Sequence, residues 1–114
     1  MAAKASGKRA VAEPRSECPV GKALDLLGDR WTLLVIRDMA INGDRTYNEF
    51  LGAPESIPTN TLALRLKRLE EAGVVVKEPY QQNPPRYTYK LTDKGRDLLP
   101  VLRSLRDWSL AYGD

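Results

Sequence analysis

The sequence predicts an α+β fold in which helices occupy both ends of the chain and a two-stranded hairpin lies between them. Three observations predict this class. Apolar residues recur at helical spacing before residue 73 and again after residue 92. Between these stretches, residues 74–77 and 86–91 are rich in β-branched and aromatic residues, which favour strands. The segment Asn83-Pro84-Pro85 separates the two runs and is typical of a loop.

The composition of the 114 residues limits the classes of protein to consider. The length supports one domain with a modest core. The absence of histidine excludes Ser-His-Asp catalysis, Cys-His catalysis and histidine-based metal sites, and a single cysteine excludes a thiolate zinc site within one chain. No glycine-rich phosphate-binding loop is present. We therefore predict a protein that is not an enzyme and that needs no metal or cofactor.

The sequence also predicts a cytoplasmic protein with an anionic partner. No apolar run approaches the roughly 20 residues that span a bilayer, and residues 1–15 lack the apolar core of a secretory signal. The single cysteine excludes an intrachain disulfide. The net charge is +3, and the excess lies upstream of residue 93, because residues 93–114 hold four basic and four acidic side chains. A basic surface confined to part of a small domain favours nucleic acid.

A basic tail and two helices are expected first. Residues 1–17 lack periodicity and are expected to be disordered, which leaves residues 18–114 as the domain. The first helix is predicted to begin at Pro19, whose fixed φ suits a first turn, and to end at Gly28. Asp29 is the expected cap of a second helix over residues 30–40, which carries Trp31 into the core.

The next two helices are predicted to form a helix-turn-helix pair. Thr46 with Glu49 makes a capping box for a short third helix, which Gly52-Ala53-Pro54 ends. The fourth helix is expected over residues 59–72, with Gly73 as its stop. A short turn-rich segment joins the two helices, as in this motif.

The hairpin and a final helix complete the predicted winged helix-turn-helix. The first strand is expected over residues 74–77 and to be limited by Pro79, and the second over residues 86–91. The loop between them forms the tip of the wing. Thr92 is the expected cap of one continuous final helix that runs to about residue 112.

The fourth helix has the side chains of a helix that reads DNA. Leucines line one side, while Asn60, Leu64 and Lys67 lie on the other. Asn pairs with adenine, Lys with guanine or phosphate, and an outward leucine has a partner in a thymine methyl. A solvated amphipathic helix is the alternative. With the wing, whose stiff loop holds basic residues near the DNA backbone, the predicted DNA contacts are Thr46, Thr59, Asn60, Thr61, Leu64, Arg65, Lys67, Arg68, Lys77, Arg86 and Lys90. For the wing, the alternative is an ordinary exposed hairpin.

The final helix carries an apolar seam that predicts a homodimer. Leu98, Val101, Leu105, Trp108 and Tyr112 recur at spacings of three and four residues, as in a coiled coil. A seam that ends in aromatic residues at the chain terminus favours a partner helix, although intrachain packing is the alternative. The predicted interface residues are Leu98, Val101, Leu102, Leu105, Trp108 and Tyr112.

Two interpretations stay open for Cys18, which is expected at the N-cap of the first helix. The positive end of a helix dipole favours a thiolate there, as in a redox or electrophile sensor that links subunits or takes up a small thiol. The alternative is a small buried packing residue.

Several motifs occur in the order found in one known family. They are Cys18-Pro19-Val20, the run from Ala23 to Asp38, the pattern T-L-x-x-R-L-x-x-L-E-x-x-G-V-V over residues 61–75, and N-P-P-R-Y-x-Y-x-L-T-x-K-G over residues 83–95. Together with the leucines before Trp108, they resemble the HxlR-type helix-turn-helix regulators of bacteria. The resemblance covers residues 18 to about 112. It implies a winged-helix fold, homodimers built from terminal helices, and regulation at promoter operators.

Within the resemblance, some relatives use a cysteine at the position of Cys18 to sense oxidants or quinones. The chain departs from the family at Thr46, where many relatives have a basic residue, and at Pro58, where a Ser or Thr cap is usual. The expected function is therefore regulation of transcription by a homodimer on palindromic double-stranded DNA, with no known effector. A winged-helix adaptor between proteins is the alternative.

Overall fold

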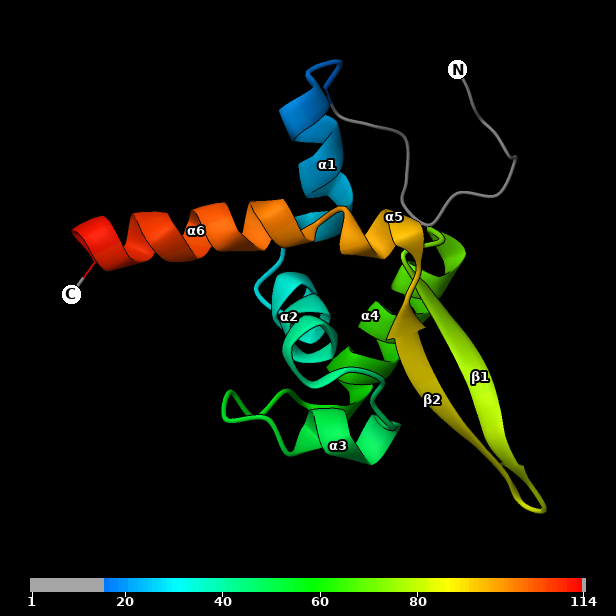
Figure 1. The fold of residues 1–114 in the computed structure, drawn as a ribbon. Helices are drawn as coiled ribbons and strands as arrows, with labels where there is room; N and C mark the ends of the chain where they lie inside the picture. Colours follow the sequence, from blue (N-terminus) through cyan, green and yellow to red (C-terminus); the bar gives the residue numbers. More distant parts are fainter. Residues whose placement is uncertain (1–15, 114) are drawn as a thin grey trace.

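The computed structural model describes residues 16–113 and confirms the α+β class, with a winged helix-turn-helix arrangement (Figure 1). Most of the expected disordered tail therefore lies outside the described residues. The elements are α1 (Pro19–Leu27), α2 (Thr32–Asn42), α3 (Tyr47–Leu51), α4 (Thr59–Glu71), β1 (Val75–Gln82), β2 (Pro85–Leu91), α5 (Asp93–Arg96) and α6 (Leu99–Tyr112).

Local capping explains where the first helices begin. Cys18 is the N-cap of α1 and Pro19 stands in its first turn, as predicted. Asp29 accepts hydrogen bonds from the N–H groups of Trp31 and Thr32, at 2.8 and 3.0 Å. Asp29 therefore accepts N–H groups at the start of α2, as predicted, but the N-cap residue itself is Trp31. The predicted bounds of 30–40 were wrong by two residues at each end, because Asp29 closes a separate turn before α2 begins at Thr32.

The capping box of α3 forms as its residues predict. The Thr46 hydroxyl accepts from the N–H of Glu49, and the Glu49 carboxylate accepts from the N–H of Thr46. Both predicted breaks also stand where expected. Gly52 follows α3, and Gly73 follows α4 with a φ of 77°, a conformation that glycine adopts without steric cost.

The wing is longer than its residues predict. β1 and β2 pair antiparallel from Val75 with Leu91 to Gln82 with Pro85, and Pro79 lies inside β1 opposite Tyr87. The expectation that Pro79 would end the first strand was wrong. A two-stranded sheet leaves an edge on each strand, and proline is tolerated on such an edge. The register is irregular between Pro79 and Gln81, just beyond the proline.

The predicted single helix after Thr92 is two helices. Thr92 caps α5, as expected, but α5 ends at Arg96 and α6 begins at Leu99. Pro100 in the first turn of α6 explains the break, because its ring lacks an N–H and would collide with the carbonyl group four residues earlier. Gly95 holds α5 close to the base of the wing, where a Cβ atom would collide with the carbonyl oxygen of Val74.

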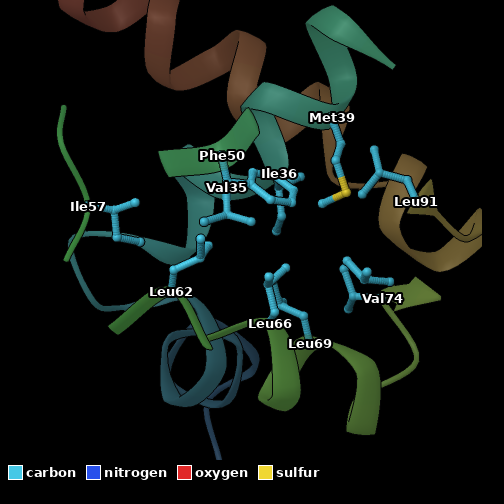
Figure 2. Packing of buried hydrophobic residues seen from close by; sticks show 11 residues of the cluster. Val35, Ile36, Met39, Phe50, Ile57, Leu62, Leu66, Leu69, Val74 and Leu91 are labelled. Atoms are coloured by element: carbon cyan, nitrogen blue, oxygen red, sulfur yellow. The ribbon is translucent and has the colours of Figure 1, made fainter. Parts of the chain in front are cut away.

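A single apolar core joins the central helices to the base of the wing (Figure 2). The leucines predicted for the inner side of α4 are all buried. Trp31 packs against this core, as predicted, although it is only half-buried. The core residues are Val35, Ile36, Met39, Phe50, Ile57, Leu62, Leu66, Leu69, Val74, Val75 and Leu91. Among the helices of residues 16–113, none has the length and hydropathy to cross a bilayer.

Candidate DNA-binding surface

The outward side of α4 is exposed and chemically mixed. Asn60 and Lys67 are exposed, and Leu64 between them exposes 52% of its surface. The buried leucines lie on the other side of the same helix, so the helix is fixed to the core by one side only. An amide, an ammonium group and an apolar side chain therefore stand together where a partner can reach them.

The start of α4 is held by a tyrosine rather than by a side-chain cap. Pro58 occupies the N-cap and offers no side-chain hydrogen bond. The hydroxyl of Tyr47, in α3, donates to the carbonyl oxygen of Thr59 at 2.6 Å. Thr59 is exposed and Thr61 is half-buried. Thr46, which was also predicted to contact DNA, uses its hydroxyl in the capping box of α3.

Two of the basic residues predicted to contact DNA, Arg65 and Arg68, instead contact other parts of their own chain. Nε of Arg65 lies 3.0 Å from Oδ1 of Asp29, and only 18% of the Arg65 side chain is exposed. The guanidinium of Arg68 donates to the carbonyl oxygen of Asp25, in α1, at 3.0 Å. Helical periodicity places both residues beside the outward side, but it does not show that acceptors from α1 and from the α1–α2 turn engage them.

The Asp29 carboxylate remains charged over the ordinary pH range. Burial alone would raise its pKa, but hydrogen bonds from the Thr32 hydroxyl and the Trp31 N–H, together with the Arg65 guanidinium and the Thr32 N–H, outweigh burial and lower the pKa of Asp29 to about 2. One carboxylate thus accepts N–H groups at the start of α2 and pairs with α4 at the same time.

The wing displays three basic side chains with different surroundings. Nζ of Lys77 lies 4.7 Å from the ring centre of Tyr87, and Nζ of Lys90 lies 3.6 Å from the Glu78 carboxylate. Arg86 is exposed beside the loop at the tip. In Figure 1 the wing and α3 extend to one side of α2, whereas α1 and α6 lie on the other side.

Sequence reasoning missed Arg45, which links the wing to the helix-turn-helix pair. Its backbone forms an isolated bridge with Tyr89, with hydrogen bonds of 3.0 and 2.7 Å. The half-buried Arg45 comes directly before the cap of α3, so the position of α3 is tied to β2. A single bridging residue has no periodicity, and the sequence therefore carries no signal for it.

The loop between α3 and α4 is also fixed from α2. The guanidinium of Arg37 donates to both carboxylate oxygens of Glu55, at 2.8 and 2.9 Å, and also to Asp38. The Arg37 guanidinium lowers the pKa of Glu55 to about 2. A bidentate pair of this kind restrains the chain that leads into α4.

The residues predicted for a dimer interface fall into two groups. Leu98 and Leu102 are half-buried against the core of their own chain and attach α6 to it. The other four extend along the exposed side of α6, and Trp108 packs on Tyr112 with ring centres 5.9 Å apart. The four exposed residues are Val101, Leu105, Trp108 and Tyr112.

Helix α1 adds to the exposed apolar surface and carries Cys18 at its start. Val20 and Leu24 of α1 are exposed. Cys18 is exposed as well, so the alternative of a buried packing residue was wrong. The N–H groups of Gly21 and Val20 lower the pKa of the Cys18 thiol from its ordinary value.

Comparison with known proteins gives consistent matches. Residues 26–114 match the model of the HxlR-like helix-turn-helix family. The uncharacterized HTH-type transcriptional regulator YdeP of Bacillus subtilis is 38% identical over 97 residues, which cover 85% of this chain and 75% of that protein. YybR, an uncharacterized HTH-type transcriptional regulator of the same organism, is 36% identical over 109 residues, which cover 96% of this chain and 86% of YybR.

Solved structures of regulators superimpose on the chain. The redox regulator HypR in its reduced form gives a TM-score of 0.77 at 36% identity, covering 85% of this chain and 95% of that chain. The reduced form of the transcriptional regulator YodB from B. subtilis gives a TM-score of 0.71 at 31% identity, with the same coverages of 85% and 95%.

Proposed function

The chain belongs to the HxlR-like helix-turn-helix family of transcriptional regulators, and from this premise we propose that it is a cytoplasmic homodimer that binds palindromic operator DNA with α4 in the major groove. Residues 18–114 form the DNA-binding and dimerising domain in this proposal. The observation that carries it is the outward side of α4, where Asn60, Leu64 and Lys67 are exposed on a helix whose other side is buried.

The exposed side chains of α4 match the chemistry of base edges and phosphates. The Asn60 amide can pair with adenine, and Lys67 with guanine or phosphate. Leu64 can contact a thymine methyl, and this contact would explain why an apolar side chain is exposed on α4. Thr59 and Thr61 lie in the first turn, where N–H groups favour phosphate. On the wing, Lys77, Arg86 and Lys90 are proposed to contact the flanking backbone.

The exposed apolar side of α6 supports a second copy of the chain as partner. Leu98 and Leu102 fix the start of α6 to the core, and the helix then extends away from the body of its own chain (Figure 1). Its outer residues therefore find no cover on that chain, whereas a twofold partner would bury them. Twofold symmetry also suits a palindromic site, because each copy then reads one half-site.

The test of the proposal is DNA affinity as a function of salt, measured for the parent and two variants on a site selected from a random DNA pool. The parent is expected to lose affinity steeply as salt rises, since each phosphate contact releases counterions. Lys67→Ala should weaken binding to all sequences and lower the salt slope by about one. Asn60→Ala should cost about 1–3 kcal/mol on the selected site and relax the preference at one base pair.

Arg103→Ala is the matched control for charge. It removes one exposed positive charge from α6 rather than from the proposed DNA surface, and it should keep the parent's salt slope. If Lys67→Ala and Asn60→Ala both bind as the parent does, α4 does not read DNA. The adaptor function would be favoured instead if no DNA sequence is selected and the parent binds a protein partner with an affinity that does not fall as salt rises.

We further propose that Cys18 makes this regulator responsive to oxidants; the similar protein HypR is a redox regulator with a reduced and an oxidised form. The exposed thiol with a lowered pKa supports the proposal. Its thiolate would attack a small disulfide, forming a mixed disulfide on Sγ and releasing one thiolate of the reagent. Since the chain holds one cysteine, no disulfide can form within it.

Oxidised glutathione is a suitable probe of Cys18. The parent is expected to gain one glutathione by mass spectrometry and to change its DNA affinity, and dithiothreitol should reverse both effects. Cys18→Ser should show neither effect while binding the operator like the reduced parent. If the glutathione adduct forms but DNA affinity stays unchanged, Cys18 does not regulate DNA binding. If no adduct forms, the Cys18 thiol is not reactive.

A further inference from the structure

Polar contacts hold α4 at three points along its length, and each comes from a different part of the chain. Tyr47 of α3 holds the carbonyl oxygen of Thr59 at the start of the helix. Asp29, between α1 and α2, holds Arg65 near the middle. The Asp25 carbonyl of α1 holds Arg68 in the last turn. The buried leucines decide which side of α4 faces the core, and the polar contacts add restraints on the exact rotation of the helix about its axis.

The contact between Arg65 and Asp29 is suited to restrain that rotation. Both side chains are largely shielded from solvent, with 18% and 22% exposed. Asp29 is itself fixed, because it accepts two backbone N–H groups and the Thr32 hydroxyl, whose Oγ1 lies 2.5 Å from Oδ2. The ion pair therefore ties α4 to a carboxylate whose own position is fixed, rather than to a mobile surface acid.

We infer that Arg65 is a positioning residue, which sets the rotation of α4 through Asp29 and does not itself contact a phosphate. The inference rests on the proposed function, since the orientation of α4 matters to binding only if the helix enters a groove. With the pair intact, Asn60, Leu64 and Lys67 face outward together. A displacement of about 1 Å is enough to misplace base contacts, whose hydrogen bonds tolerate little change in length.

Charge makes the inference testable, because the two interpretations predict opposite effects of one variant. Asp29→Asn removes a negative charge from the protein, so simple electrostatics predicts tighter DNA binding. If Asp29 positions α4 through Arg65, the same variant should bind more weakly. The asparagine side-chain oxygen can still accept the N–H groups of Trp31 and Thr32, although the hydrogen bond from the Thr32 hydroxyl to the second oxygen is lost.

The experiment compares Asp29→Asn, Arg65→Gln and the double variant in operator affinity and salt slope. Each single variant is expected to lose about threefold to tenfold in affinity, and the double variant no more than the larger single loss, because Asp29→Asn removes the charge of the ion pair and Arg65→Gln removes its other partner. The salt slope should stay at the parent's value in all three, whereas Lys67→Ala lowers it. Circular dichroism melts and the DNA-binding stoichiometry confirm that each variant is folded.

The outcomes separate the inference from the proposed function. If Asp29→Asn binds as tightly as the parent or more tightly, while Arg65→Gln lowers the salt slope, Arg65 contacts phosphate and the inference fails alone. If the losses of the two single variants add in the double variant, the residues act independently and the inference also fails. A parent that shows no salt-dependent binding to DNA overturns the proposed function itself.

Discussion

Replacing Leu66 by alanine is expected to lower the free energy of unfolding by about 2–5 kcal/mol, the range for a leucine truncated in a packed core. Leu66 is 2% exposed and packs among buried residues of α2, α4 and the base of the wing (Figure 2). Alanine would leave a cavity in the surface that holds α4 in place. Urea unfolding followed by circular dichroism measures the loss, and an unchanged slope against urea confirms that stability alone has changed.

Leu64→Ala is the matched control on the same helix. The chemical change is identical, but Leu64 is 52% exposed on the outward side. Its unfolding free energy should stay within about 0.5 kcal/mol of the parent. Its operator affinity should fall, since the proposed contact with a thymine methyl is lost. Equal destabilisation by the two truncations would contradict the assignment of the two sides of α4.

Replacing Trp108 by aspartate is expected to convert the proposed dimer into a folded monomer. Trp108 is 66% exposed and belongs to no part of the core, so its own chain should fold without it. In a dimer, two negative charges would enter a desolvated interface at a high cost. The monomer should bind the two-half-site operator more weakly by a factor on the order of 10²–10⁴, because binding of one copy no longer holds a second copy close to the other half-site. Sedimentation velocity measures the mass, and mobility shift measures the affinity.

Leu110→Asp controls for the added charge on α6. Leu110 is more exposed than Trp108, at 78%, and lies on the opposite side of the helix. This variant should remain a dimer with the parent's affinity. A Trp108→Asp protein that sediments as a dimer would show that the partner does not cover this side of α6.

Much of the fold could be predicted because its signals are local. The capping box at Thr46 and the stop at Gly73 depend on residues within one or two turns of each other. The leucines of α4 repeat at helical spacing, which predicted both the buried side and the exposed Asn60 and Lys67. These features are decided by backbone geometry and by the apolar period, which the sequence displays directly.

The remaining features depend on contacts between distant residues. Arg65 and Lys67 are both basic and only two residues apart, yet one pairs with Asp29 while the other is exposed. Nothing local distinguishes them, because the acceptor lies 36 residues earlier in the chain. Pro79 inside β1 was missed for a similar reason, since a proline is tolerated there only because the sheet has two strands and leaves an edge of β1 unpaired. Pro100 by itself indicated a break between two helices, but the apolar residues that continue on both sides of it favoured the prediction of one helix.

The interruption between α5 and α6 means that the direction of α6 is set at residues 97–98 and not by α5. Helix α6 has 14 residues and is therefore about 20 Å long. A change of about 10° in its direction at residues 97–98 would move its far end by about 3–4 Å, which is close to the rise of one base-pair step in DNA. If α6 forms the proposed dimer contact, substitutions at residues 97–98 would change the distance between the two copies of α4, and hence the half-site spacing that suits the dimer, without any change in α4 itself.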